Sequence, residues 1–218
     1  MKLIIAILLL AIGAFAQNAS WKCEVTKKVV VGDNFKKIWD LQSNQYITNA
    51  KDTLELTNMS TGEITIMSFN PKVKTRNRCK QYAFQYDKTT NSCTGVISKE
   101  WVKQIMKGQV QVPENVLNML LDTMSHEDLI DITTSRSSAS EIIYFRNGYG
   151  ERYLKSGEQK SFELEIVRDD DYYLEANNGI FTKSHIKLNK KNQAYEMTID
   201  APFLDAFVTI TGTCTKLN

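Results

Sequence analysis

The sequence predicts a mostly β protein with two short helices, in which curved antiparallel sheets form a half-barrel or a sandwich and the helices cover one face. Runs of alternating or β-branched residues, separated by polar turns about every ten residues, indicate strands along most of the chain. Between residues 99 and 124 the apolar residues recur at helical spacing instead. Two short helices inside a β chain must cover a sheet, and the open face of a curved sheet is the natural position.

The N-terminal half begins with five predicted strands. β-branched residues are dense from Val25 to Val31, and the later runs alternate apolar and polar side chains. The five strands span residues 21–31, 35–41, 46–48, 54–57 and 63–69, and residues 58–62 form the loop of a hairpin.

A stretch bracketed by Cys79 and Cys93 follows these strands. Its three aromatic residues alternate with smaller or polar residues, which is the period of a strand. They are Tyr82, Phe84 and Tyr86. Residues 87–92 predict a turn, because Asp, Asn and Ser side chains can bond to the nearby backbone. We therefore expect a strand and a turn between two disulfide positions.

Two helices are predicted next. Ser98 suits the N-cap of the first helix, and Gly108 ends it. Pro113 opens the second helix, since its fixed φ suits the first turn. The apolar faces consist of Trp101, Val102, Ile105 and Met106 in the first helix and of Val116, Leu117, Leu120, Leu121 and Met124 in the second.

The C-terminal half returns to strands. They are predicted at residues 129–133, 141–146, 151–154, 162–167, 172–175, 180–187, 194–199 and 207–213. No repeat of fixed period and no low-complexity linker divides the sequence. Residues 17–218 are therefore predicted to form a single β-rich domain, which is long enough to bury a sizeable core.

Residues 1–16 match a secretory signal peptide. Lys2 supplies the positive charge, an apolar run from Leu3 to Leu10 follows, and Ala14 and Ala16 fit a cleavage site. This run is too short to cross a bilayer, which takes ~20 apolar residues, and no later segment is long and apolar enough. We expect a secreted, extracellular protein without a transmembrane segment.

Four cysteines, an even number in an exported chain, predict two disulfides with three ways of pairing. Termini of a domain often lie close together, so the preferred pairing joins Cys23 to Cys214 and Cys79 to Cys93. The pairing of Cys79 with Cys214 and of Cys23 with Cys93 remains its competitor.

Two sequons for N-glycosylation begin at Asn18 and Asn58. Asn58 falls on the predicted hairpin tip, and a tip offers the exposed position that an added glycan requires. We expect a glycoprotein if the source is a eukaryote. The alternative at Asn58 is a plain polar turn.

The formal net charge is +2, and removing Lys2 with the signal peptide lowers it to +1. That balance argues against a nucleic-acid partner or an anionic-membrane surface, which would need a basic patch. The one basic cluster covers residues 72–78. Its charges are not interleaved with aromatic residues, so the preferred interpretation is a solvated connection, and the alternative is binding of an anion or polysaccharide.

Catalytic patterns are weak in this sequence. His126 precedes Glu127 and Asp128, either of which could orient it as a general base, and His185 lies on a predicted strand. Neither histidine belongs to a nucleophile elbow or a paired ligand motif. We therefore expect no enzymatic activity and keep a hydrolase that uses His126 as the alternative.

No metal or other cofactor is expected. The cysteines lack Cys-x-x-Cys spacing and belong to an oxidising compartment, which argues against zinc. Asp169, Asp170 and Asp171 offer the hard oxygen ligands that suit calcium, but the glycine and the later glutamate of an EF-hand loop are absent. An acidic solvated turn is the preferred interpretation.

The remaining positive feature is apolar and aromatic. Methionine adapts to varied shapes, and ligand sites are concave and mostly apolar, so these residues suit a cavity for a hydrophobic ligand. The predicted lining residues are Phe84, Trp101, Ile105, Leu117, Leu120, Met124 and Tyr144. The leading hypothesis is binding of a lipid, fatty acid or other hydrophobic small molecule beneath the two helices. The alternative is an adhesive or structural extracellular protein with a solid core.

Part of the sequence resembles the ependymin-related family of secreted glycoproteins. The similarity lies in Tyr86-Asp87-Lys88-Thr89-Thr90-Asn91-Ser92-Cys93-Thr94, in Val112-Pro113-Glu114-Asn115-Val116 and in the late Cys214. The resemblance implies two stacked, strongly curved antiparallel sheets, similar to bacterial lipoprotein-carrier folds, with a deep hydrophobic pocket. It also implies lipid binding, association with calcium and homodimers. No calcium ligand carries over residue by residue.

Overall fold

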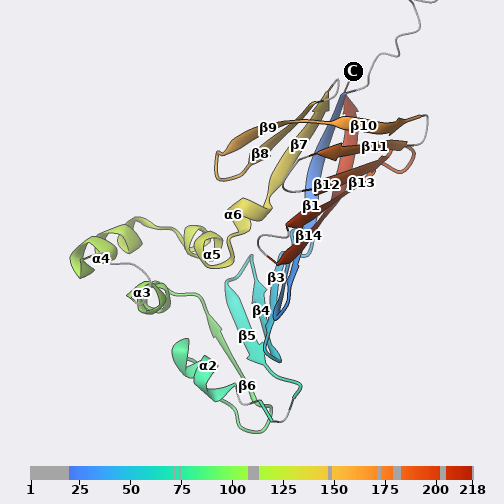
Figure 1. Ribbon diagram of the computed structural model, residues 1–218. Helices are drawn as coiled ribbons and strands as arrows, with labels where there is room; N and C mark the ends of the chain where they lie inside the picture. The colour runs from blue at the N-terminus through green and yellow to red at the C-terminus, as the bar shows by residue number, and fades with distance from the viewer. Residues whose placement is uncertain are drawn as a thin grey trace, which may run out of the picture.

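A computed structural model describes residues 20–70, 72–73, 75–107, 113–146, 149–170, 173–178, 183–201 and 205–217. The predicted signal peptide, Asn18 and Asp171 lie outside these residues, as does Gly108, the predicted end of the first helix. Figure 1 shows the arrangement of the described elements.

Within the described residues, fourteen strands join into one antiparallel sheet, as the alternating sequence pattern predicts. The order along the sheet is β10-β11-β12-β13-β14-β1-β2-β3-β4-β5-β6, and β7, β8 and β9 branch from β1. The strands are β1 (Ser20–Gly32), β2 (Phe35–Asp40), β3 (Gln45–Ala50), β4 (Thr53–Asn58), β5 (Glu63–Met67), β6 (Ser92–Val96), β7 (Glu141–Arg146), β8 (Tyr149–Leu154), β9 (Gln159–Glu163), β10 (Glu165–Asp169), β11 (Tyr173–Asn178), β12 (Lys183–Asn189), β13 (Ala194–Ala201) and β14 (Ala206–Leu217).

Strand β1 belongs to both parts of the sheet. Its first residues, Trp21 to Glu24, pair with β7, and its last residues, Lys27 to Gly32, pair with β2. The register with β14 shifts between Val25 and Lys27, so Thr26 sits at a bulge. A bulge bends the strand and increases its twist. The sheet therefore branches at Thr26.

The C-terminal part of the sheet curls round on itself. β9 and β10 are one bent strand interrupted at Leu164; β9 pairs with β8 and β10 pairs with β11. β9 and β10 run in line across the top of Figure 1. The strands from β11 through β14, β1, β7 and β8 thus form a nearly closed ring around one core.

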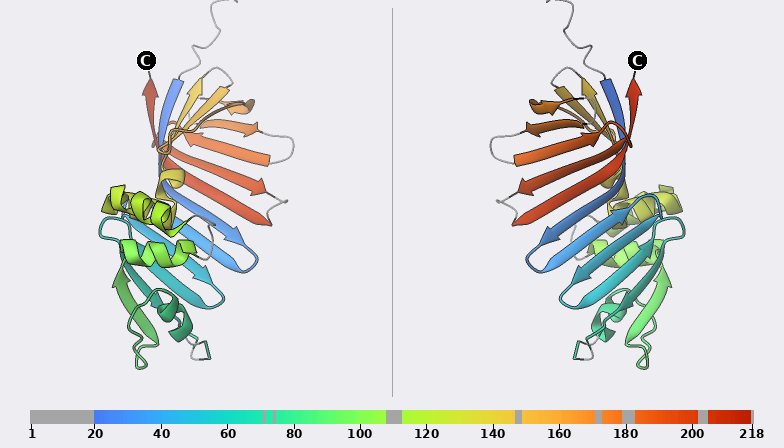
Figure 2. Two further views of the ribbon diagram at one scale, coloured as in Figure 1. Left: turned by 90° about the vertical axis from the view of Figure 1, so that its left-hand side faces the viewer. Right: turned by 90° about the vertical axis from the view of Figure 1, so that its right-hand side faces the viewer.

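Five helices occur in the described part of the chain: α2 (Arg76–Gln81), α3 (Lys99–Lys107), α4 (Glu114–Thr123), α5 (His126–Thr134) and α6 (Arg136–Ala139). α3 and α4 are the two predicted helices. The backbone N–H of Trp101 donates to Ser98 Oγ (3.2 Å), as expected for an N-cap. Figure 2 shows α3 to α5 on one face of the N-terminal sheet, while strands alone form its other face.

Two apolar cores follow from this arrangement. The first lies between the helices and β2–β6 and includes Trp39, Ile66, Trp101, Leu117 and Ile130. The second fills the C-terminal ring and includes Trp21, Phe145, Leu188, Tyr195 and Ile210. The predicted class, a mostly β fold of curved antiparallel sheet with helices on one face, is confirmed.

Three details of the predicted elements are wrong. Residues 129–133 belong to α5 rather than to a strand, because the capping box of Ser125 and Asp128 starts a helix there. Residues 82–86 are irregular and follow α2, and Ala83 has φ +57°, which breaks an extended backbone. The predicted strand 162–167 is the junction of β9 and β10 at Leu164.

Candidate functional site

The apolar layer beneath the helices is where the sequence predicts a ligand site. Amphipathic faces of α3, α4 and α5 turn toward β2–β6, because these apolar side chains recur at helical spacing. The helices contribute Trp101, Val102, Leu117, Leu121, Leu129 and Ile130 to this layer. Met59, Ile64 and Ile66 meet them from the β4–β5 hairpin.

An aromatic stack lies at one end of the apolar layer. The ring centroids of Trp101 and Tyr82 are 5.2 Å apart, and those of Tyr82 and Phe84 are 5.7 Å apart. The Tyr82 hydroxyl donates to Glu55 Oε2 (2.9 Å), and the Arg78 guanidinium lies 4.8 Å from the Tyr82 ring centroid. Burial, together with the Glu55 carboxylate, raises the pKa of Tyr82 well above its usual value. The Tyr82 hydroxyl therefore stays protonated at neutral pH and donates its hydrogen bond to Glu55.

The indole N–H of Trp101 has no hydrogen-bond partner among the described residues, although Nε1 is fully buried. Trp39, in the same core, donates its indole N–H to Thr134 O at 2.6 Å. Leaving a buried donor unpaired costs about 1–3 kcal/mol, so such groups are rare in folded proteins. The indole N–H of Trp101 is thus a buried hydrogen-bond donor in this layer, and a bound molecule could accept its hydrogen bond.

The seven predicted lining residues do not all meet. Trp101 and Leu117 are buried in the helix-covered core, and Phe84, Ile105 and Met124 pack against it. Leu120 points outward and is 43% exposed. Tyr144 lies on β7, on the face opposite the buried Ile143, where its ring contacts Tyr153 edge-on. Five of the seven predicted residues are thus brought together, and Leu120 and Tyr144 are not.

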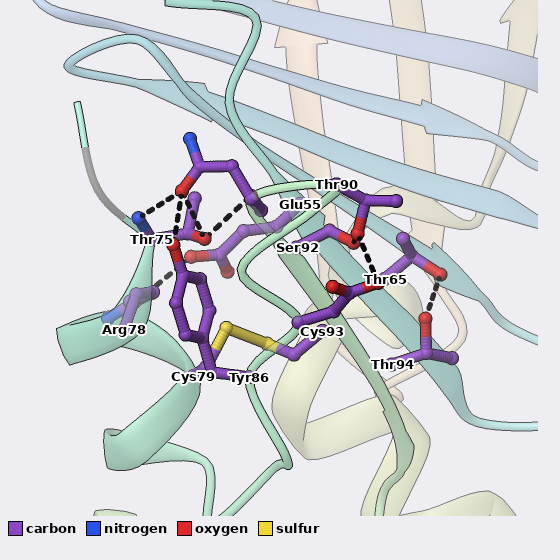
Figure 3. Close-up of a disulfide and its surroundings, with 12 residues drawn as sticks. Glu55, Thr65, Thr75, Arg78, Cys79, Tyr86, Thr90, Ser92, Cys93 and Thr94 are labelled. Carbon is purple, nitrogen blue, oxygen red and sulfur yellow. Dashed lines mark hydrogen bonds and ion pairs between the residues drawn. A yellow bond between two sulfur atoms is a disulfide. The ribbon is translucent and has the colours of Figure 1, made fainter. Parts of the chain in front are cut away.

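Beside the aromatic stack, a disulfide and a hydrogen-bonded turn hold α2 against β6. Cys79 and Cys93 are joined, and Figure 3 shows Thr75 and Tyr86 next to this bond. The side chain of Asn91 connects the parts: its Oδ1 accepts from the Thr75 N–H (3.2 Å) and the Tyr86 hydroxyl (3.0 Å), and its Nδ2 donates to Val73 O (2.8 Å). Val73 and residues 75–93 are therefore held together at several points.

A polar hollow of about 740 Å³ opens at this braced turn. Its lining residues come from the start of α2, the turn and β6, and they are Arg76, Gln85, Tyr86, Asp87, Lys88, Thr89 and Thr94. The Asp87 carboxylate accepts from the Thr89 N–H (2.7 Å) and the Thr90 hydroxyl (2.9 Å). These hydrogen bonds lower the pKa of Asp87, the one from the Thr89 N–H most and the one from the Thr90 hydroxyl next, so the carboxyl stays ionised.

The two disulfides pair as the preferred of the predicted arrangements. Cys23 bonds to Cys214 and Cys79 bonds to Cys93. Cys23 and Cys214 face each other in the β1–β14 register, which brings the two ends of the described chain together. The second disulfide spans the segment that contains the turn of residues 87–92.

His126 and the neighbouring acids make structural contacts. The ring Nε2 of His126 lies 3.0 Å from Thr61 O. Asp128 accepts from the Ser125 N–H (2.8 Å) and hydroxyl (2.6 Å), and Glu127 pairs with Arg136 (2.7 Å). Neither carboxylate orients the histidine as the hydrolase alternative would require. The other histidine, His185, is exposed on β12.

Two of the three candidate calcium aspartates, Asp169 and Asp170, are described, and both are in ion pairs. Asp169 pairs with Lys190, and Asp170 pairs with Arg168 at 2.6 Å. Within the described ranges, no group of three or more His, Cys, Asp or Glu side chains is arranged to hold a metal ion.

Asn58 is less accessible than a hairpin tip suggests. It is half-buried, and its side-chain oxygen accepts from the Ser60 N–H (2.9 Å) and the Thr61 N–H (3.2 Å). The next residue, Met59, is fully buried, and its carbonyl accepts from Arg136 of α6 (3.0 Å). Ser60 and Thr61 at the tip are exposed as expected, whereas Asn58 itself is half-buried beside α5 and α6. Glycosylation of Asn58 stays a prediction.

Asn91, Arg76 and Lys88 are site residues that sequence reasoning did not single out. Asn91 was part of a predicted turn, and Arg76 was part of the basic cluster, but nothing in either pattern shows which side chains converge. The two cysteines at 79 and 93 were the available signal, since a short disulfide loop must fold back on itself.

Comparison with known proteins adds no identity: no protein-family model and no curated protein matches this sequence. Among the residues described, no helix is both long and apolar enough to cross a membrane.

Proposed function

We propose that this chain binds a hydrophobic ligand, such as a fatty acid, between α3–α4 and the covered face of β2–β6. The unpaired indole N–H of Trp101 in an otherwise apolar layer is the observation that carries the proposal. A carboxylate or carbonyl oxygen at the head of a lipid would accept this hydrogen bond. Its tail would lie among apolar side chains, where burial contributes about 25 cal/mol per Å².

The neighbouring side chains suit such a ligand. Met106 and Met124 pack at the margin of the core, and methionine adjusts its shape at little energetic cost. The stacked rings of Tyr82 and Phe84 offer a flat apolar wall. The Phe84 ring lies directly over Gly95 of β6, where an added Cβ would be only 2.1 Å from the ring.

Movement of the helices would give the ligand access. α3 has nine residues and α4 has ten, and isolated helices of this length are not stable in water. Exposed contacts hold them: Lys103 pairs with Glu114 (2.9 Å), and Lys99 donates to Asp122 O (3.1 Å). Exposed ion pairs of this kind contribute little stability, so the buried apolar faces of α3 and α4 hold these helices in place, and they would have to part from the sheet to admit a ligand.

A chain that binds such a ligand would act as a secreted, non-enzymatic carrier. The two disulfides fit an oxidising compartment, and the predicted signal peptide at residues 1–16 would deliver the chain there. The sequence resemblance to the ependymin-related family implies the same kind of ligand. Calcium has no role in this proposal.

Titration calorimetry with dodecanoic acid tests the proposal, using Trp101→Phe and, as the matched change in the other core, Trp21→Phe. Loss of one hydrogen bond to a carboxylate is worth about 1.5–3 kcal/mol, so Trp101→Phe should weaken binding about 10- to 100-fold. Trp21→Phe should leave affinity within about twofold. Absence of binding by the unaltered protein, or equal losses in both variants, would contradict the proposal.

A second candidate is an extracellular interaction protein with a solid core. Leu117, Leu121, Leu129 and Ile130 fill the layer beneath the helices, each less than 5% exposed, which favours this alternative. Native mass spectrometry of the purified protein separates the two. A bound lipid mass supports the carrier, and a bare polypeptide mass that stays bare after incubation with dodecanoic acid supports the solid core.

A further inference from the structure

We propose that the polar hollow beside the Cys79–Cys93 disulfide binds an acidic oligosaccharide, whose carboxylate or sulfate groups are held by Arg76 and Lys88. The hollow is built from the first turn of α2, residues 85–89 and β6, and none of the seven predicted hydrophobic pocket residues is among its lining residues. The inference is therefore independent of the hydrophobic-ligand proposal.

Arg76 and Lys88 carry the available positive charge. Both side chains are exposed, and neither has an ion-pair partner in the described part of the chain. Arg78, two residues further along α2, differs because it forms an ion pair with Glu55. The two arginines of the basic cluster therefore differ: Arg78 is paired and supports the fold, whereas Arg76 is unpaired among the described residues and faces the hollow.

The one carboxylate in the lining is already engaged. Asp87 accepts the Thr89 N–H at 2.7 Å and the Thr90 hydroxyl at 2.9 Å, and both bonds lie inside the turn. With two cations against one carboxylate, the lining carries a net positive charge. An anionic group is therefore favoured, and guanidinium matches carboxylate and sulfate in a two-point contact.

The rest of the lining suits hydroxyl-rich sugar rings. Gln85 supplies an amide, Thr89 and Thr94 supply hydroxyls, and Tyr86 supplies a ring whose own hydroxyl is bonded to Asn91. The volume of about 740 Å³ is that of a ligand site, and the hollow is open and lined by polar and charged residues. A hydrated, polar ligand fits these properties.

The hollow is rigid before any ligand arrives. The disulfide ties α2 to β6, and Thr75 donates through its hydroxyl to Asn91 O (2.7 Å) immediately before Arg76. Asp87 and Ser92 exchange two backbone hydrogen bonds (2.8 and 3.2 Å) across the turn. Preorganisation of this kind lowers the ordering cost of binding.

Isothermal titration with three defined tetrasaccharides tests the inference: a sulfated heparin fragment, an unsulfated galacturonate and neutral cellotetraose. The variants are Arg76→Gln, Lys88→Gln and their combination. Lys80→Gln removes the same charge from the same helix at an exposed position outside the hollow, which makes it the matched control. Circular dichroism and a free-thiol count check that each variant is folded and that its disulfides are intact.

We expect at least one acidic tetrasaccharide to bind, the neutral one to bind at least about tenfold more weakly, and the double variant to lose about tenfold or more in affinity. Lys80→Gln should change affinity less than about twofold. Preference for the heparin fragment or for the galacturonate identifies the acid. Failure of both to bind, binding of inorganic sulfate alone, or an equal loss in Lys80→Gln would overturn the inference.

Discussion

At the scale of single residues, Tyr195 holds a phenol hydroxyl inside the C-terminal core. The residue is 2% exposed, and its hydroxyl has no partner among the described residues. Tyr195→Phe removes only this hydroxyl, so we expect the free energy of unfolding in urea to rise by about 1–2 kcal/mol. Tyr86→Phe is the control, because the Tyr86 hydroxyl is bonded to Asn91, and it should lower that free energy by about 1 kcal/mol. A loss of stability in Tyr195→Phe would show that its hydroxyl is paired.

Individual site residues were predictable where helical spacing identifies a buried face. Trp101 and Leu117 lie under the helices as that spacing indicates. Leu120 does not, because the sheet-facing line of α4 passes through Leu117 and Leu121, four residues apart. Tyr144 has the residue type of a pocket wall, but a strand sends alternate residues to opposite faces, and the sequence does not say which face of β7 is inside.

At the scale of elements, α5 should lose stability in acid. The Ser125 hydroxyl and N–H lower the pKa of Asp128, and Lys155 and then Arg136 lower the pKa of Glu127. Carboxyls whose pKa is lowered by folding stabilise the fold above their unfolded pKa, about 4, and this stability is lost as pH falls through the lowered folded pKa.

The measurement is the melting temperature of wild type and of Ser125→Ala from pH 7 to pH 2.5. We expect Ser125→Ala to melt at a lower temperature at pH 7, and the difference to shrink as Asp128 becomes protonated. A difference that stays constant over this pH range would show that the capping box does not govern the acid response.

The elements that the sequence missed share one cause. A short run such as residues 129–133 has apolar residues that suit either a strand or one face of a helix, and the cap at Ser125 decides between them. Residues 82–86 alternate like a strand, but the turn that follows Cys79 and the left-handed backbone of Ala83 override that preference. Most hairpins were predictable because their turns and alternation agree.

At the scale of the whole molecule, a buried ion cluster holds the branch of the sheet. Glu141 at the start of β7 is 4% exposed, and its carboxylate accepts two bonds from Arg152 (2.6 and 2.9 Å) and lies 3.4 Å from Lys28 Nζ of β1. Glu141→Gln leaves these cations without their counter-charge, so we expect the free energy of unfolding to fall by about 3–5 kcal/mol.

Glu158→Gln is the control for this prediction, since it breaks an exposed pair with Lys160 and should change stability little. Urea unfolding followed by tryptophan fluorescence measures both variants. Similar effects of the two substitutions would show that the cluster at the branch does not stabilise the fold.

The branched sheet places the helix-covered apolar layer and the polar hollow in its N-terminal part, apart from the C-terminal ring. β1 runs through both parts, the helices cover only the N-terminal one, and the disulfide between Cys79 and Cys93 sets the polar hollow at its far edge. The class of fold was predictable from local patterns, whereas the branch at Thr26 depends on long-range pairing of β1 with β7 and β2, which no local pattern encodes.

Photo-cross-linking tests whether a hydrophobic ligand lies beneath α3 and α4. A fatty acid with a diazirine in its chain is bound to the unaltered protein and irradiated, and the labelled peptides are mapped. We expect labels in peptides that contain residues 99–107 and 114–123, and we expect excess unlabelled fatty acid to suppress them. Labels confined to β7–β14, or no competed label at all, would contradict this expectation.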